Sequence, residues 1–236
     1  MAIAHKGEFT KGIILTVSFL VVLAVIYSPV FKGKNGLEAA DELFNSIAKG
    51  STYYIPSVIQ KNEAFIGKDF NVTIAMNNAD MAEKTAFLFS TAGAAVDQTG
   101  AELTIRGDLG KVLGAALQDA DDMFNNRGDA LADKYGYDPK EAMYNWWQAC
   151  KLVDKALKKQ KRFKEAKFVS EVQTKAVETG YNFYGIAPES VSERAGILSF
   201  SLIFYVVYTL WWGFAIFFLF EGWGLRMEAS KQKKEV

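Results

Sequence analysis

Two uninterrupted apolar runs divide the chain. The longer run, Ile197 to Phe220, has 24 residues and no charged side chain. A helix of this length covers about 36 Å, more than the roughly 30 Å hydrocarbon core of a bilayer. The other run, Ile13 to Phe31, has 19 uncharged residues, enough to span a bilayer with little tilt. The pattern predicts transmembrane helix 1 over 13–31 and transmembrane helix 2 over 197–220.

The first run can also be read as a secretory signal, because Lys6 and Lys11 precede it. Its apolar core is longer than that of a typical signal peptide, and no small-x-small cleavage site follows it closely. The zone where cleavage would occur instead holds mostly bulky residues, namely Tyr27, Pro29, Val30 and Phe31. We therefore expect an uncleaved signal anchor.

Two spans place the leader (1–12) and the basic tail (221–236) on one side of the membrane and residues 32–196 on the other. Six basic residues lie near the spans on the terminal side and four on the loop side: Lys6, Lys11, Arg226, Lys231, Lys233 and Lys234 against Lys32, Lys34, Lys49 and Arg194. Positive charge favours the cytoplasmic side, and the first helix usually dominates orientation. We expect a bacterial inner-membrane protein with both termini cytoplasmic and residues 32–196 periplasmic.

Between the spans, apolar residues recur mostly at helical spacing, as in the amphipathic stretch 37–49. Two short segments, 70–74 and 101–106, instead alternate apolar and polar residues, which is typical of strands. Asn78 can cap a helix between them, so strand, helix and strand predict a small crossover unit. The predicted fold class is mainly α, with two transmembrane helices flanking an extracytoplasmic, predominantly helical α+β domain that contains a small two-strand element.

Helix-start signals organise the second half of this domain. Asp108 can cap a helix that reaches about residue 135, with a break near 125–128. Asp138-Pro139-Lys140-Glu141 combines an N-cap, a first-turn proline and a capping-box glutamate. The helix that it starts lacks Gly and Pro until Gly180, and its apolar face shifts near Gln160, where we expect a bend. Segments 119–141 and 151–167 are expected to form a long helical hairpin.

Lys151 to Lys167 is the most basic stretch, with eight basic residues against two acidic ones. Its candidate electrostatic surface comprises Lys155, Lys158, Lys159, Lys161 and Arg162. Such a surface suits an anionic lipid, a nucleic acid or an acidic partner. The alternative is a solvated helix face whose charge is balanced by the acidic segment 119–141. The net charge of zero and the periplasmic location argue against nucleic acid.

Candidate catalytic and metal-binding residues are few. The chain has one histidine, His5, and one cysteine, Cys150, which excludes most His/Cys zinc sites, histidine-ligated haem and Ser-His-Asp or Cys-His catalysis within it. No Gly-rich nucleotide-binding motif occurs. Asp119, Asp121 and Asp122 have the spacing that starts a calcium loop, but the required Gly and Glu are replaced by Phe124 and Ala130. We interpret these acids as helix-surface residues and expect no cofactor.

Aromatic pairs supply the remaining candidates. Trp211 and Trp212 lie deep in the second span beside Gly213, where a small residue allows a neighbouring helix to approach. They are candidate contacts with a partner membrane helix, although packing on the first span or exposure to lipid is the alternative. Trp146 and Trp147 point about 100° apart on a helix, so one of them is expected in the core. Ser190 and Glu193 predict a capping box that leads directly into the second span.

Three functions fit these features. The first is a membrane-anchored structural or accessory subunit whose spans and outer domain bind other membrane or periplasmic proteins, with a second copy of the chain among the partners considered. The second is an extracytoplasmic sensor of a small ligand or ion that signals through a partner. The third, a carboxylate-based enzyme, is the least favoured, because no carboxylate pair stands out.

Overall fold

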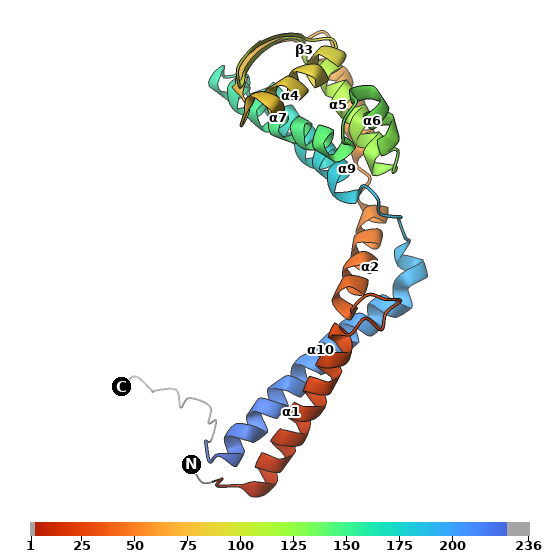
Figure 1. Cartoon of the computed structure of the whole chain (residues 1–236), viewed down its shortest axis with the longest axis vertical. Coiled ribbons are helices and arrows are strands. Elements are labelled where there is room, and N and C mark those ends of the chain that lie inside the picture. The colour runs from red at the N-terminus through yellow and green to blue at the C-terminus, as the bar shows by residue number, and fades with distance from the viewer. Residues whose placement is uncertain (1–2, 226–236) are drawn as a thin grey trace, which may run out of the picture. The chain divides into compact units, whose positions relative to one another are not determined.

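The computed structural model describes residues 3–225 (Figure 1). The chain packs as two compact units. We call Ala48–Pro188 the α+β unit; the other unit combines Met1–Ile47 with Glu189–Val236. The predicted outer domain, 32–196, extends beyond the α+β unit at both ends. Four of the basic residues used to predict the orientation lie outside the described residues: Arg226, Lys231, Lys233 and Lys234.

The two apolar runs form the long helices α1 (Lys6–Tyr27) and α10 (Val191–Gly222). Both are long and apolar enough to cross a membrane. Few of their residues are buried within the protein: 11% of the most apolar 18-residue stretch of α1, and 6% of that stretch of α10. The amphipathic stretch forms α2 (Gly36–Ser51). The prediction of a capping box at Ser190 was wrong. The Ser190 side chain makes no hydrogen bond to the helix backbone, and its Oγ lies 2.7 Å from Ser192 Oγ instead. The helix nevertheless runs unbroken from Val191 through the apolar segment, as predicted.

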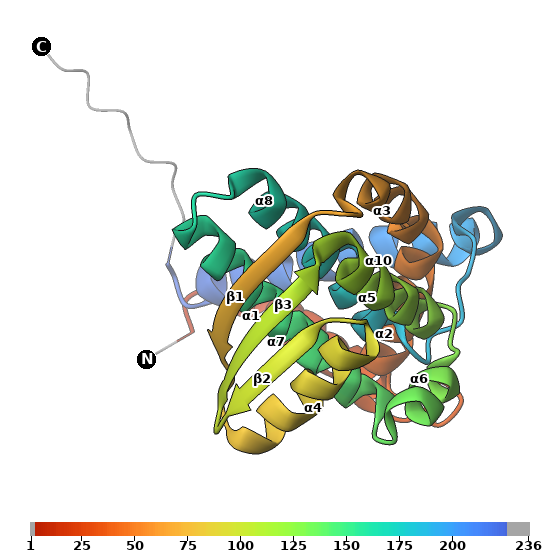
Figure 2. The same cartoon turned by 90° about the horizontal axis from the view of Figure 1, so that it is seen from above.

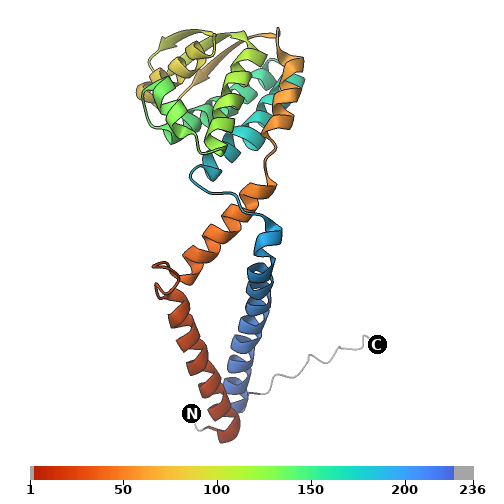
Figure 3. The ribbon, with the colours of Figure 1, turned by 90° about the vertical axis from the view of Figure 1, so that its right-hand side faces the viewer.

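Helices α1 and α10 pack against each other most closely at the end where α1 begins and α10 ends (Figure 3, red and blue). A Cβ atom on Gly12 would lie 2.7 Å from the backbone nitrogen of Leu219, and one on Gly222 would lie 2.6 Å from Phe9 Cα. The backbone N–H groups of Ala4 and His5 both donate to the Gly222 carbonyl, each at 3.0 Å. Glycine is therefore required for backbone contact at this end of the helix pair.

The α+β unit contains a three-stranded antiparallel sheet in the order β1-β3-β2, formed by β1 (Asp69–Ala75), β2 (Ala95–Thr99) and β3 (Glu102–Asp108) (Figure 2). The two predicted strands, β1 and β3, are confirmed, with Val72 opposite Ile105. The prediction of a two-strand element was wrong, because it lacked β2. This strand has one apolar residue inside it that is even partly buried, Val96, so it carries no alternating pattern.

Strand β2 also changes the connection that α4 makes between strands. Helix α4 (Ala79–Thr91) was expected to connect two paired strands, but it leads from β1 to β2, which lie on opposite sides of β3. A tight turn at Gly100, with φ of 60°, then reverses the chain into β3. Because β3 is antiparallel to both neighbours, β1 and β2 run in the same direction, as a helical crossover requires.

The predicted helix starts and breaks are largely confirmed. The side chains of Asn78, Asp108 and Asp138 accept bonds from the backbone N–H three residues on. The other helical elements are α3 (Ile55–Asn62), η1 (Glu63–Phe65), α5 (Leu109–Phe124), α6 (Gly128–Tyr135), α7 (Pro139–Lys159), α8 (Phe163–Val172), the π-helical η2 (Gln173–Val177) and α9 (Glu178–Phe183). Helix therefore dominates the chain, as predicted.

A helical hairpin is present, but α7 and α8 form it, whereas the prediction paired segments 119–141 and 151–167. Helix α7 turns through residues 160–162 and packs against α8. The acidic segment 119–141 was expected to face the basic segment 151–167. Instead, Lys134 pairs with Asp119 inside the acidic segment, and Lys158 pairs with Asp154 inside the basic segment. Glu141 pairs with Lys84, which belongs to neither segment. Among the described residues, no ion pair joins these two segments, so the acidic segment does not neutralise the basic one.

The core of the α+β unit lies between the sheet and the helices. The buried face of the sheet carries Phe70, Val72, Ile74, Leu103 and Ile105. Helices α4 and α7 pack against this face, and α5 packs against α9 (Figure 2). The helix predicted to end at Gly180 continues to Phe183. Gly180 is buried, and a Cβ on it would lie 2.7 Å from the Ala120 carbonyl oxygen, so glycine here permits close helix packing.

Candidate functional site

The predicted electrostatic surface lies at the turn between α7 and α8. We call Lys155, Lys158, Lys159, Lys161 and Arg162 the basic turn surface. Its four lysines are exposed and Arg162 is half-buried. Lys158 pairs with Asp154 at 2.7 Å and Arg162 with Glu165 at 3.1 Å. The other three lysines form no ion pair with any described residue, so the structure brings five cations together with little compensation.

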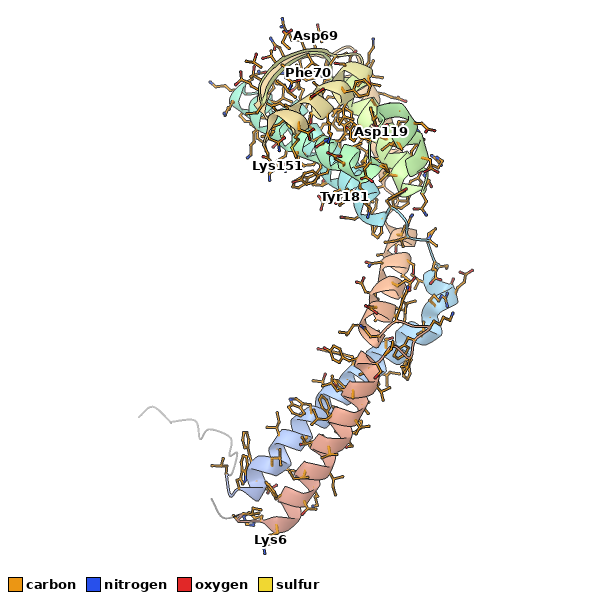
Figure 4. The ribbon with its side chains drawn as sticks, viewed as in Figure 1. Lys6, Asp69, Phe70, Asp119, Lys151 and Tyr181 are labelled. Atoms are coloured by element: carbon orange, nitrogen blue, oxygen red, sulfur yellow. The ribbon has the colours of Figure 1, made fainter. Side chains whose placement is uncertain are left out.

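An open groove of about 600 Å³ lies beside this surface. We call it the arginine groove; its lining is Asp69, Phe70, Asn71, Arg106, Gly107, Gln160 and Arg162. Strands β1 and β3 supply one wall and the α7–α8 turn supplies the other. Gln160 Nε2 donates to the Asn71 carbonyl at 2.7 Å and so fixes the turn to the edge of β1. Figure 4 shows Asp69 and Phe70 at this end of the α+β unit.

Both groove arginines have one carboxylate partner and remain accessible. Arg106 pairs with Asp97 and is 54% exposed, whereas Arg162 donates through Nε and NH2 to a single oxygen of Glu165. The Glu165 carboxyl bonds to its own backbone amide, and this bond together with Arg162 holds its pKa below the ordinary value. A guanidinium has five N–H donors, so each arginine retains donors for another anion.

The structural role of Asp119 is the main feature that the sequence interpretation missed. It was interpreted as a helix-surface acid, but it is 1% exposed. Its carboxylate accepts bonds from Lys134 Nζ at 2.7 Å, Tyr135 OH at 2.5 Å and Trp146 Nε1 at 2.9 Å. Burial, reinforced by Asp119, raises the pKa of Tyr135. This cluster joins α5, α6 and α7 within the core and is structural. No local sequence signal identifies it, because the three donors come from later in the chain.

A second buried polar group is Lys49, which is 2% exposed. Its ammonium donates to Asn126 Oδ1 at 3.1 Å and to the carbonyls of Phe183 and Ile186 at 3.0 and 2.6 Å. Burial lowers the pKa of Lys49 from its ordinary value. These bonds tie the first residues of the α+β unit to its last ones. Lys49 was counted among residues near the membrane surface, and its structural role follows only from the tertiary contacts.

Of the candidate membrane contacts, Trp211 lies between α1 and α10, whereas Trp212 and Gly213 are exposed on α10. Trp211 Nε1 donates to the Leu15 carbonyl at 3.1 Å, and the Trp212 ring lies 4.6 Å from that of Phe19. Packing on the first span, the alternative considered, therefore accounts for Trp211. Trp212 remains 39% exposed, and nothing lies within 4 Å of a Cβ built on Gly213. This part of the α10 surface is uncovered within the protein.

The second tryptophan pair behaves as expected. Trp146 is fully buried, whereas Trp147 is half-buried; its ring stacks with Tyr144 at 6.1 Å, and Lys151 lies 5.0 Å above it. One turn after Trp146, Cys150 is a free thiol, 3% exposed, and burial raises its pKa to about 12. Cys150 is therefore an inert core residue in the folded protein.

Within residues 3–225, no group of three or more His, Cys, Asp or Glu side chains is placed to hold a metal ion. The expectation of no cofactor remains a prediction. Comparison with protein families, curated proteins and solved structures found no match. The functional argument therefore rests on the chemistry of the described surfaces.

Proposed function

We propose that this chain is a membrane-anchored accessory or scaffold subunit that binds partner proteins through its spans and its outer domain. In this proposal α1 and α10 cross a bacterial inner membrane, both termini are cytoplasmic, and residues 32–196 are periplasmic. The exposed apolar surfaces of α1 and α10 support the membrane assignment.

The observation that carries the partner assignment is the open position at Gly213. Helices associate in membranes where small residues allow close backbone approach. The glycines at positions 12 and 222 are already occupied by contacts between α1 and α10, but Gly213 has no such contact. Beside it, Trp212 presents a partly exposed aromatic ring. A helix of another subunit, or of a second copy of the chain, fits against this surface.

The test is affinity purification of the full chain from its native membrane in a mild detergent. A stoichiometric membrane partner is expected, and Gly213→Leu should reduce its recovery at least severalfold. Gly196→Leu is the matched control, because this glycine also lies on α10 with nothing within 4 Å of a built Cβ. A lone monomer would contradict the proposal. Thermal stabilisation of that monomer by a metabolite or Ca²⁺ would instead favour the sensor.

A protease-protection experiment tests the orientation separately. Cells with an opened outer envelope are treated with external protease, and fragments are detected through tags on each terminus. Cleavage within 32–196 with both tags protected is expected. Resistance of this segment would contradict the periplasmic assignment.

A further inference from the structure

We propose that the arginine groove binds an acidic segment of a partner protein, whose carboxylates contact Arg106 and Arg162. This inference rests on the proposed function and specifies the chemistry of the partner at the outer domain. It combines three independent features of the α+β unit: the charge around the groove, the shape of the groove, and the backbone conformation of the turn that forms one wall.

The charge favours a ligand with separated carboxylates. Arginine binds carboxylates in a bidentate manner, and both groove arginines retain unused N–H donors. The surrounding stretch 151–167 carries eight basic and two acidic residues. Asp69 also lines the groove, and its charge repels an anion placed beside it. A ligand that spreads its charges over the two arginines avoids this repulsion better than a compact phosphate group does.

The shape favours a polypeptide over a small metabolite. Small-molecule sites are concave and enclose most of their ligand. The arginine groove is open, and Phe70, its one large apolar lining residue, is only 3% exposed. It therefore offers hydrogen bonds and charge along an open surface but no exposed large apolar side chain, as suits a polar, acidic chain.

The turn is held in a conformation that its sequence disfavours. Lys161 has φ of 60°, in the left-handed region where a side chain costs about 1–2 kcal/mol. Glycine would fit this position without that cost. A lysine there places an exposed cation beside the groove, and such backbone strain is characteristic of functional sites. Lys161→Gly thus removes a charge while preserving the turn.

The groove lies at the end of the α+β unit away from the unit's own chain connections. Lys140, near the start of α7, lies 5.9 Å above the ring of Tyr181, shortly before the chain leaves the α+β unit at Pro188. Helix α7 has 21 residues, which corresponds to about 30 Å. The α7–α8 turn is therefore at the end of the unit away from its chain connections, and Figure 4 shows Asp69 and Tyr181 at opposite ends.

The test measures binding of a fluorescein-labelled peptide of alternating Glu and Ser to the full chain in neutral detergent. Fluorescence anisotropy is recorded at low salt and at physiological ionic strength, about 0.15 M. The double variant Arg106→Gln/Arg162→Gln should weaken binding at least about tenfold, which corresponds to about 1.4 kcal/mol. Lys161→Gly should weaken it severalfold. Lys140→Gln removes one charge, as Lys161→Gly does, but at the other end of α7, and it should leave binding unchanged.

Several results would overturn the inference. These are equal binding of a peptide with Gln in place of Glu, equal losses in Lys140→Gln and the arginine variant, or tighter binding of pyrophosphate, a single-stranded oligonucleotide or anionic-lipid vesicles. The inference can fail while the proposed function stands: a membrane partner would then co-purify equally with the wild type and the arginine variant, and the acidic peptide would not bind. If no partner co-purifies but the peptide binds as described, only the proposed function fails.

Discussion

Replacing Asp119 by alanine tests whether the buried carboxylate holds three helices of the α+β unit together. The change removes the acceptor of Lys134, Tyr135 and Trp146. The Lys134 side chain is 33% exposed and can hydrogen-bond to water instead, so losing its bond to Asp119 costs little stability. The Tyr135 and Trp146 donors, by contrast, remain buried. A buried donor left unsatisfied costs about 1–3 kcal/mol. Two such donors are left unsatisfied, and the missing carboxylate leaves a small cavity. Asp119→Ala should therefore lower the free energy of unfolding by about 3–5 kcal/mol.

The single cysteine provides an assay specific to this unit. Cys150 is buried on the same helix as Trp146, one turn away, and is the only thiol in the chain. Its reaction with a maleimide in increasing urea therefore reports unfolding of the α+β unit and not of α1 and α10. The protein is kept in detergent throughout, and labelling is read by mass spectrometry. The midpoint should shift to lower urea in Asp119→Ala.

Two further variants make the prediction refutable. Asp133→Ala changes an exposed acid on α6 and should shift stability by less than about 0.5 kcal/mol. Tyr135→Phe removes one donor, and its effect should not add to that of Asp119→Ala; a coupling of about 1–2 kcal/mol is expected between directly bonded groups. An Asp119→Ala effect below about 1 kcal/mol, or full additivity with Tyr135→Phe, would refute the reasoning.

Three more predictions concern the helix pair, the chain connections and alkaline pH. Gly12→Val forces a side chain against Leu219 and should destabilise the α1–α10 pair by about 1–3 kcal/mol; thermal unfolding in detergent should show this loss, and Gly7→Val, with open space around it, should not. Lys49→Met removes the charged donor to two carbonyls, so amide exchange of residues 183–187 should accelerate about tenfold, as expected for a loss of about 1.4 kcal/mol; unchanged exchange would show that the buried ammonium contributes nothing there. Burial raises the pKa of Tyr137 to about 12, whereas an unfolded tyrosine ionises near pH 10. The unfolded chain thus binds fewer protons from pH 10 upward, stability should fall between pH 10 and 12 in urea titrations, and Tyr137→Phe should reduce the slope.

The structure separates what local patterns reveal from what depends on packing. The paired strands β1 and β3 alternate buried and exposed residues, so their sequence predicts them; β2 is an exposed edge strand, and its sequence lacks that alternation. The caps at Asn78, Asp108 and Asp138 were predictable because each acts within three residues. The partners of Asp119 lie 15 to 27 residues away, and nothing in its neighbours indicates burial.

The sequence by itself determined the two apolar helices, the helical character of the segment between them and the concentration of positive charge near residue 160. These properties follow from composition and from short-range spacing, which the chain carries in any fold. Tertiary structure alone decided that this charge stays uncompensated by the acidic segment, that Arg106 joins Arg162 beside a groove, and that Gly213 stays open while Gly12 is covered. Each of these depends on which distant residues the folded backbone brings together, and residue order alone does not specify those distances.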